Sequence, residues 1–142
     1  MLEAITAMAS VIGDPYLLML IAVTTVLGIV IGVLPGLGAT TGAALLLPFT
    51  LTMSPVNAIA VLATLYVSAT FAGSITAILI NTPGTSAAAA TTFDGFPLAQ
   101  RGEAGRALGI AVVSSTIGGI FSIIVLCLAA PLLARVAYEF RP

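Results

Sequence analysis

The sequence predicts an all-α polytopic integral membrane protein whose helices are broken or re-entrant. Of its 142 residues, 60% are hydrophobic and 6% are charged, and the mean hydropathy is +1.24. No charged side chain occurs between Asp14 and Asp94, and a charge-free run of this length is typical of chains that lie in lipid. The apolar runs are interrupted at residues 35–38 (PGLG) and 81–84 (NTPG).

These two interruptions are the features of the sequence that most strongly indicate a function. Lipid satisfies no backbone N–H or C=O group, so irregular backbone at membrane depth occurs only where it is buried in protein or lines a cavity. Transport proteins use such broken helices to build sites near the middle of the membrane. The pattern therefore favours a transport protein over a simple membrane anchor.

The apolar runs, and the residues that begin or end helices between them, predict where the helices lie. Residues 1–15 are an interfacial lead-in without the basic residues of a secretory signal. Pro35 ends or kinks the first span because proline lacks an N–H. Ser54 and Pro55 form a typical helix start, with serine as the N-cap. The expected spans are 16–34, 36–53 (either a short span or a re-entrant half-helix), 56–80 and 107–134, with a short helix at 85–92 packed against protein and a charged loop at 93–106.

Each interruption is followed by the start of a new helix. The first N–H groups of a helix have no internal partner, and the helix dipole places partial positive charge there. Glycines let a ligand approach the backbone, so two such starts would bind an anion without any Lys or Arg. The predicted binding residues are Pro35, Gly36, Gly38, Thr40, Thr41, Asn81, Thr82, Pro83 and Gly84.

Other chemistry finds little support in the sequence. The glycines at 36–42 do not follow the GxGxxG spacing of dinucleotide sites, and no Lys follows as in a P-loop. The chain contains no His and no Lys, which excludes serine–histidine, zinc and serine–lysine intramembrane catalysis. Asp94 and Glu103 are interpreted as solvated loop charges. We therefore predict no enzyme activity and no metal centre, and the lack of a basic patch argues against nucleic-acid binding.

Small and hydroxylated residues recur along the expected spans. Gly28 and Gly32 have the four-residue spacing that lets membrane helices pack closely. The single cysteine, Cys127, is interpreted as a buried hydrophobic residue. The hydroxyls are expected to bond mostly to carbonyls of their own helix, although they could line a polar path; they belong to Ser68, Thr70, Ser74, Thr76, Ser114, Ser115 and Thr116.

Four segments in this order resemble the large membrane subunit of the tripartite tricarboxylate transporters. They are residues 32–41, 70–84, 94–99 and 102–109, and together they extend over nearly the whole chain. The family's PGLG and NTPG segments correspond to 35–38 and 81–84. The resemblance implies a partial transporter bundle and a multi-pass permease of the bacterial inner membrane. It implies symport of a tricarboxylate-like solute with a coupling cation, Na⁺ or H⁺. The implied partners are a small membrane subunit and a periplasmic solute-binding protein.

The resemblance leaves open whether the chain is part of a longer permease and how it is oriented in the membrane. Members of the family are several times longer, so residues 1–142 are expected to be the N-terminal part of a permease domain. The alternative is a small structural or assembly membrane protein whose glycines serve helix packing alone. Arg101 and Arg106 favour a cytoplasmic loop at 93–106 by the positive-inside rule, whereas Arg135 and Arg141 argue for the opposite orientation with equal number.

Overall fold

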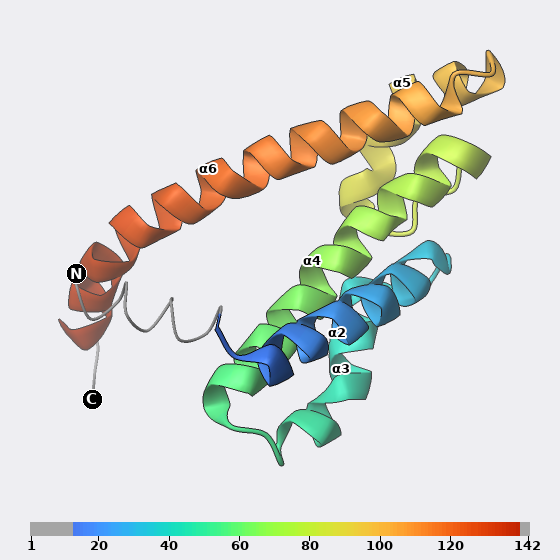
Figure 1. Ribbon diagram of the computed structural model, residues 1–142. Helices are drawn as coiled ribbons and strands as arrows, with labels where there is room; N and C mark the ends of the chain where they lie inside the picture. The colour runs from blue at the N-terminus through green and yellow to red at the C-terminus, as the bar shows by residue number, and fades with distance from the viewer. Residues whose placement is uncertain (1–12, 140–142) are drawn as a thin grey trace.

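The computed structural model describes residues 13–139, and every regular element in this range is helical. Of the lead-in predicted for 1–15, residues 1–12 lie outside the described part, as do residues 140–142. Figure 1 shows the arrangement of the elements. They are α2 (Pro15–Val33), α3 (Ala39–Thr50), α4 (Pro55–Ile80), the 3₁₀ helix η1 (Ser86–Ala90), α5 (Thr91–Gln100) and α6 (Ala104–Glu139).

The helix ends follow local sequence signals. The Asp14 side chain accepts a hydrogen bond from the Tyr16 N–H (2.9 Å) at the start of α2, and α2 ends just before Pro35. Ser54 caps α4 by accepting from the Asn57 N–H (3.4 Å), with Pro55 in the first helical position. The predicted ends at Pro35 and Ser54 are therefore confirmed, because proline and a side-chain acceptor act through local geometry.

Helix α4 is the central element of the packing. It contacts all five other elements, and its buried side chains recur every three or four residues. Leu65, Ala69 and Ala72 on this stripe are completely buried, as expected for one face of a helix. Helix α3 has 12 residues, about 18 Å at 1.5 Å per residue, which is shorter than the ~30 Å hydrocarbon core. Of the two alternatives for 36–53, the structure therefore favours the half-helix.

Glycines bring α2 and α4 into close contact. A Cβ atom built on Gly28 would overlap the Ser68 hydroxyl, and one on Gly32 would overlap the carbonyl group of Ala69. The predicted role of Gly28 and Gly32 in helix packing is thus confirmed. Gly105 and Gly109 differ, since nothing lies within 4 Å of a Cβ at either position among the described residues.

The segment predicted as a charged loop, 93–106, is mostly helical. Helix α5 covers Thr91–Gln100, and a short turn through Gly102 leads into α6 at Ala104. The prediction of a loop was wrong, since the segment is helical even though it contains Gly95 and Pro97. Gly95 sits against Ile78, where a Cβ atom would lie 2.7 Å from Cγ1, so tertiary packing against α4 outweighs a weak local preference.

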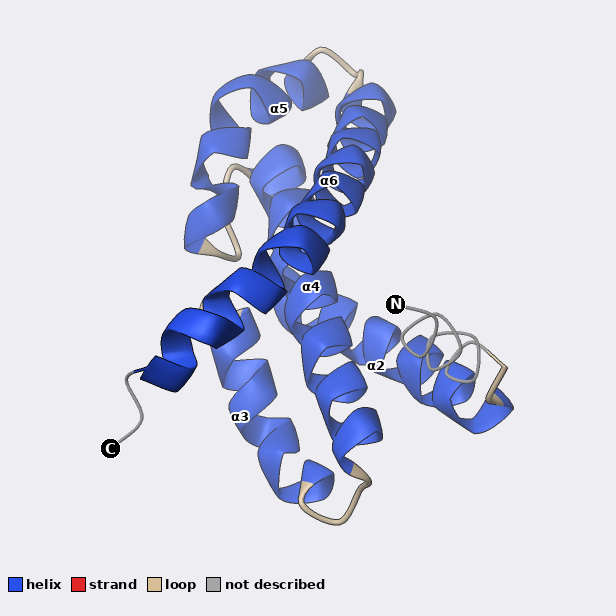
Figure 2. Cartoon of the chain, turned by 90° about the vertical axis from the view of Figure 1, so that its left-hand side faces the viewer, coloured by secondary structure: helices blue, strands red, loops and turns tan. Residues whose placement is uncertain are grey.

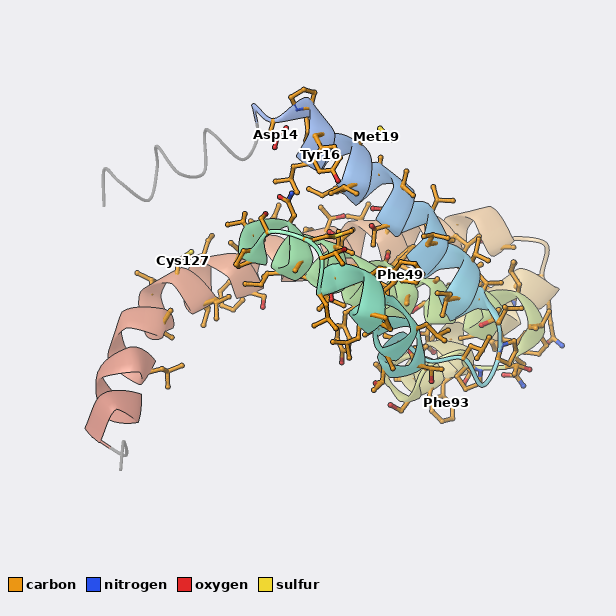
Figure 3. All side chains as sticks on the ribbon, turned by 90° about the horizontal axis from the view of Figure 1, so that it is seen from below. Asp14, Tyr16, Met19, Phe49, Phe93 and Cys127 are labelled. Atoms are coloured by element: carbon orange, nitrogen blue, oxygen red, sulfur yellow. The ribbon has the colours of Figure 1, made fainter. Side chains whose placement is uncertain are left out.

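The surface of the described chain is strongly apolar. Figure 3 shows the labelled side chains of Met19, Phe49 and Phe93 projecting from the ribbon, and Phe93 is 79% exposed. Three helices are long and apolar enough to cross a membrane: α2, α4 and the 104–130 part of α6. Exposed apolar surface of this extent, on helices of spanning length, identifies an all-α membrane protein.

Helix α6 is the least covered element. It contacts α4 and α5 but neither α2 nor α3, and none of the apolar window in its 104–130 part is buried. Figure 2 shows α6 crossing α4 and continuing toward the C-terminus. Cys127 is exposed here, so the prediction that it is buried was wrong. Its neighbours in sequence are apolar, but within residues 13–139 no second helix covers this part of α6.

Candidate functional site

The first interruption forms a tight turn between α2 and α3. The Leu37 N–H donates to the Leu34 carbonyl (3.1 Å), and Gly36 has a φ of 91°, a conformation that favours glycine. Gly38 is the N-cap of α3, and no side chain caps this helix start. The first N–H groups of α3 therefore remain available to a ligand, as the sequence predicts.

The second interruption turns the chain back along α4. Asn81 adopts the left-handed conformation with a φ of 55°, and the Thr82 N–H donates to the Thr76 carbonyl (3.3 Å). The Gly84 N–H then donates to the Gly73 carbonyl (3.3 Å). Gly73 precedes the end of α4 by seven residues, which corresponds to about 10 Å along the helix. Gly84 therefore lies beside the body of α4 rather than beyond its end.

Three glycines join the two interruptions. A Cβ atom on Gly84 would overlap the Gly32 carbonyl and would lie 2.9 Å from the Gly73 Cα. Gly32 belongs to the last turn of α2, just before the first interruption. Residues far apart in the sequence are thus held together by contacts that only glycine permits.

One cavity of about 240 Å³ opens at this junction. Its lining mixes polar and apolar surface and carries no charge, since it consists of glycines, alanines, a tyrosine and hydroxyl-bearing side chains. Beside it, Thr85 has a buried Oγ1 atom with no hydrogen-bond partner among the described residues. The lining residues are Gly36, Gly38, Ala39, Thr40, Tyr66, Thr70, Gly84, Thr85, Ser86 and Ala87.

The structure divides the predicted binding residues into two groups. Gly36, Gly38, Thr40 and Gly84 line the cavity, whereas Pro35, Thr41, Asn81, Thr82 and Pro83 do not. Members of the second group shape the turns: Asn81 ends α4 in the left-handed conformation, and the Thr82 hydroxyl bonds to the Ile80 carbonyl (3.2 Å). Both interruptions therefore lie at the same cavity, but only Gly36 and Gly38 of the first and Gly84 of the second line it.

Helix α4 also contributes to this cavity, through Tyr66, which was not predicted, and through Thr70, whose hydroxyl was named only as a possible part of a polar path. Tyr66 and Thr70 are four residues apart and lie on one face of the helix, a spacing that pointed to a shared surface. Thr85 and Ser86 follow the second interruption directly, at the start of η1. Nothing in the sequence alone placed α4 between the two interruptions, because that follows from the packing of Gly32, Gly73 and Gly84.

The chain has helices of spanning length and an apolar exterior, and its two interruptions meet at one uncharged cavity. These features define a membrane protein of the broken-helix class. Comparison with known proteins agrees with this class. Residues 18–142 match the family described as the tripartite tricarboxylate transporter TctA family. The chain belongs to this family.

A relative in Agrobacterium vitis supports the same family. It is described as an uncharacterized 52.8 kDa protein in the TAR-I ttuC' 3'region, and it is 47% identical over 118 residues. The match covers 83% of this chain and 24% of the relative, so the chain spans about a quarter of that relative's length. No solved structure matches this chain.

Proposed function

We propose that residues 1–142 form the N-terminal part of the large permease subunit of a binding-protein-dependent tripartite system. This subunit would carry a tricarboxylate-like solute across the bacterial inner membrane as a multi-pass protein. A periplasmic solute-binding protein would deliver the solute, and a small membrane subunit would complete the complex. Family membership supports the transporter class, and the lining of the cavity supports the chemical class of the solute.

The observation that carries the proposal is the meeting of both interruptions at one cavity. The uncapped start of α3 offers N–H groups and partial positive charge to a carboxylate. Hydroxyls of Thr40, Tyr66 and Ser86 line the same space and can donate further hydrogen bonds. None of the lining side chains is acidic, so nothing in the lining repels an anion.

Movement of the solute would be coupled to a cation, either Na⁺ or H⁺, in symport. A gradient of this kind supplies the free energy that a secondary transporter needs. Backbone carbonyls near the second interruption, together with Asn81, are one candidate for the cation's ligands. The alternative function, a structural protein with glycine-mediated packing, fits Gly28 and Gly32 but does not require the cavity at the two interruptions.

Uptake of radiolabelled citrate by cells that express the full-length protein with its partner subunits tests the proposal. Thr40→Val keeps the side-chain shape but removes the hydroxyl from the cavity. We expect the apparent KM to rise roughly fivefold, because one net hydrogen bond contributes about 1 kcal/mol.

Thr116→Val is the matched control. Its hydroxyl bonds to the Val112 carbonyl within exposed α6 (2.8 Å), and Thr116 lines neither this cavity nor the others described. Uptake with unchanged KM in the Thr116 variant and a raised KM in the Thr40 variant would support the site. An unchanged KM in both variants would argue against a carboxylate at this cavity.

A further inference from the structure

A second cavity, of about 260 Å³, lies where α4, α5 and α6 meet. It is distinct from the cavity at the two interruptions, since the two share no lining residue. Its lining includes one carboxylate, Asp94, and four hydroxyl-bearing residues. These are Ser74 of α4, Thr91 of α5, and Ser114 and Ser115 of α6.

Asp94 lies on α5, away from the charged turn that follows this helix. Helix α5 and the start of α6 form a hairpin around Gly102, and Asp94 precedes Arg101 in this turn by seven residues. At 1.5 Å per residue, the carboxylate lies about 10 Å along α5 from the charged turn. The same cavity extends along α6 from Ala107 to Ser115, within a candidate membrane span.

None of the arginines whose side chains the structure describes forms an ion pair with Asp94. The ion pair found among residues 13–139 joins Arg106 to Glu103 (2.8 Å) at the beginning of α6. Asp94 does lie in the first turn of α5, where the helix dipole favours a negative charge. That effect is small at an exposed position, and it does not explain why hydroxyls from two other helices face the same cavity.

Three of the four hydroxyls around this cavity make no bond to a carbonyl of their own helix. The expected bonding of hydroxyls to carbonyls of their own helix is confirmed for Ser68, Thr70, Thr76, Ser114 and Thr116. Within the described residues, the side chains of Ser74, Thr91 and Ser115 make no hydrogen bond. All three line the second cavity. Their oxygen lone pairs are therefore free to act as ligands.

We propose that Asp94, with hydroxyl oxygens of Ser74, Thr91 and Ser115, binds a monovalent cation, Na⁺, between α4, α5 and α6. Hard cations take oxygen ligands, and protein sites for divalent ions usually combine several carboxylates. Here one carboxylate and neutral hydroxyls balance a single positive charge. Asp94 is exposed at the cavity, so a cation can reach it. Binding needs no transport activity, although a role in coupling rests on the proposed function.

The site would also connect the cation to the helix interruptions. Ser74 immediately follows Gly73, whose carbonyl accepts the hydrogen bond from Gly84 at the second interruption. Ions that hold Ser74 against α5 and α6 would thus stabilise the part of α4 on which the carboxylate cavity is built.

Thermal unfolding of the purified full-length protein in detergent tests the binding directly, with no carboxylate present. Melting temperatures are compared in NaCl and in choline chloride of equal concentration, which keeps the ionic strength constant. A ligand that binds only the folded state raises the melting temperature as its concentration increases. We expect NaCl, but not choline chloride, to raise the melting temperature of the wild-type protein.

Asp94→Asn should abolish the Na⁺-specific increase, and Ser115→Ala should raise the Na⁺ concentration needed for half of it. Ser122→Ala, an exposed position of α6 outside the cavity, should behave as wild type. If Asp94→Asn does not fold, Ser74→Ala with Ser115→Ala replaces it.

Two outcomes would overturn the proposal: equal shifts in NaCl and choline chloride for the wild type, or a full Na⁺-specific shift in the Asp94 or double-serine variant. If Na⁺ raises the melting temperature as expected but the protein takes up no citrate, the cation site is supported and the proposed function is contradicted.

Discussion

At the scale of single residues, the contacts among Gly32, Gly73 and Gly84 hold the two interruptions together. A methyl group on Gly84 or on Gly32 would overlap a backbone carbonyl of a neighbouring segment. Backbone atoms cannot rotate away as a flexible side chain can, so the segments would have to separate. The carboxylate cavity therefore depends not only on Gly84, which lines it, but also on Gly32 and Gly73, which do not.

Gly32→Ala should destabilise the protein and Gly118→Ala should not. At Gly32 the added methyl group overpacks the contact between α2 and α4, and such overpacking typically costs about 1–3 kcal/mol. At Gly118 nothing lies within 4 Å of a Cβ atom, so alanine is expected to stabilise α6 by roughly 0.5–1 kcal/mol through its higher helix propensity.

The measurement is chemical unfolding of both full-length variants in the same detergent. Equal stability of the Gly32 variant and the wild type would mean that α2 and α4 are not in the close contact described. A strong loss at Gly118 would instead show that another segment packs on that part of α6.

Residue types alone predicted part of the site and not all of it. Proline and glycine at 35–38 and 81–84 indicated the interruptions because they act on their own backbone. The split between Thr40, which lines the cavity, and Thr41, which does not, depends on how α3 is rotated about its axis. That rotation is set by packing against α4, where a Cβ on Gly42 would lie 3.2 Å from Leu65 Cδ2, and it leaves no local trace in the sequence.

At the scale of elements, the apolar spans were predictable and the charged hairpin was not. The start of α4 at Pro55 and its end at Asn81 follow from a cap and a left-handed residue. Helix α5 contains Gly95 and Pro97, which are poor helix formers, so its local sequence does not indicate a helix. The start of α6 at Ala104 follows from the Glu103 carbonyl, which accepts bonds from the Arg106 and Ala107 N–H groups.

The elements also predict a topology that labelling can check. Helix α4 has 26 residues, about 39 Å, which is enough to span the membrane. The turn at 51–54 precedes α4, whereas the turn around Gly102 lies near its other end in Figure 1. In a Cys127→Ser background, Thr52→Cys and Arg101→Cys should therefore react with impermeant maleimide from opposite sides.

By the positive-inside rule we expect Arg101→Cys to react from the cytoplasm. Labelling of right-side-out and inside-out vesicles separates the two sides. Reaction of both cysteines from the same side would rule out a membrane-spanning α4. Reaction from opposite sides with Arg101→Cys outside would keep the fold and reverse the orientation.

At the scale of the whole molecule, α6 shows how much surface the described chain leaves uncovered. Leu128 and Phe121 are 76% and 67% exposed, and the chain matches about a quarter of its relative's length. Lipid or further protein would cover this apolar helix.

The claim that both interruptions form one carboxylate site is tested most directly by substrate protection. Single cysteines replace Thr40 and Ser86, one on each side of the cavity, in the full-length Cys127→Ser protein; Thr116→Cys is the control. We predict that citrate slows maleimide labelling at Thr40→Cys and at Ser86→Cys, because a bound solute fills the space between them, and leaves Thr116→Cys unchanged. Labelling of the two cavity cysteines at the same rate with and without citrate, in protein that still takes up citrate, would contradict the account.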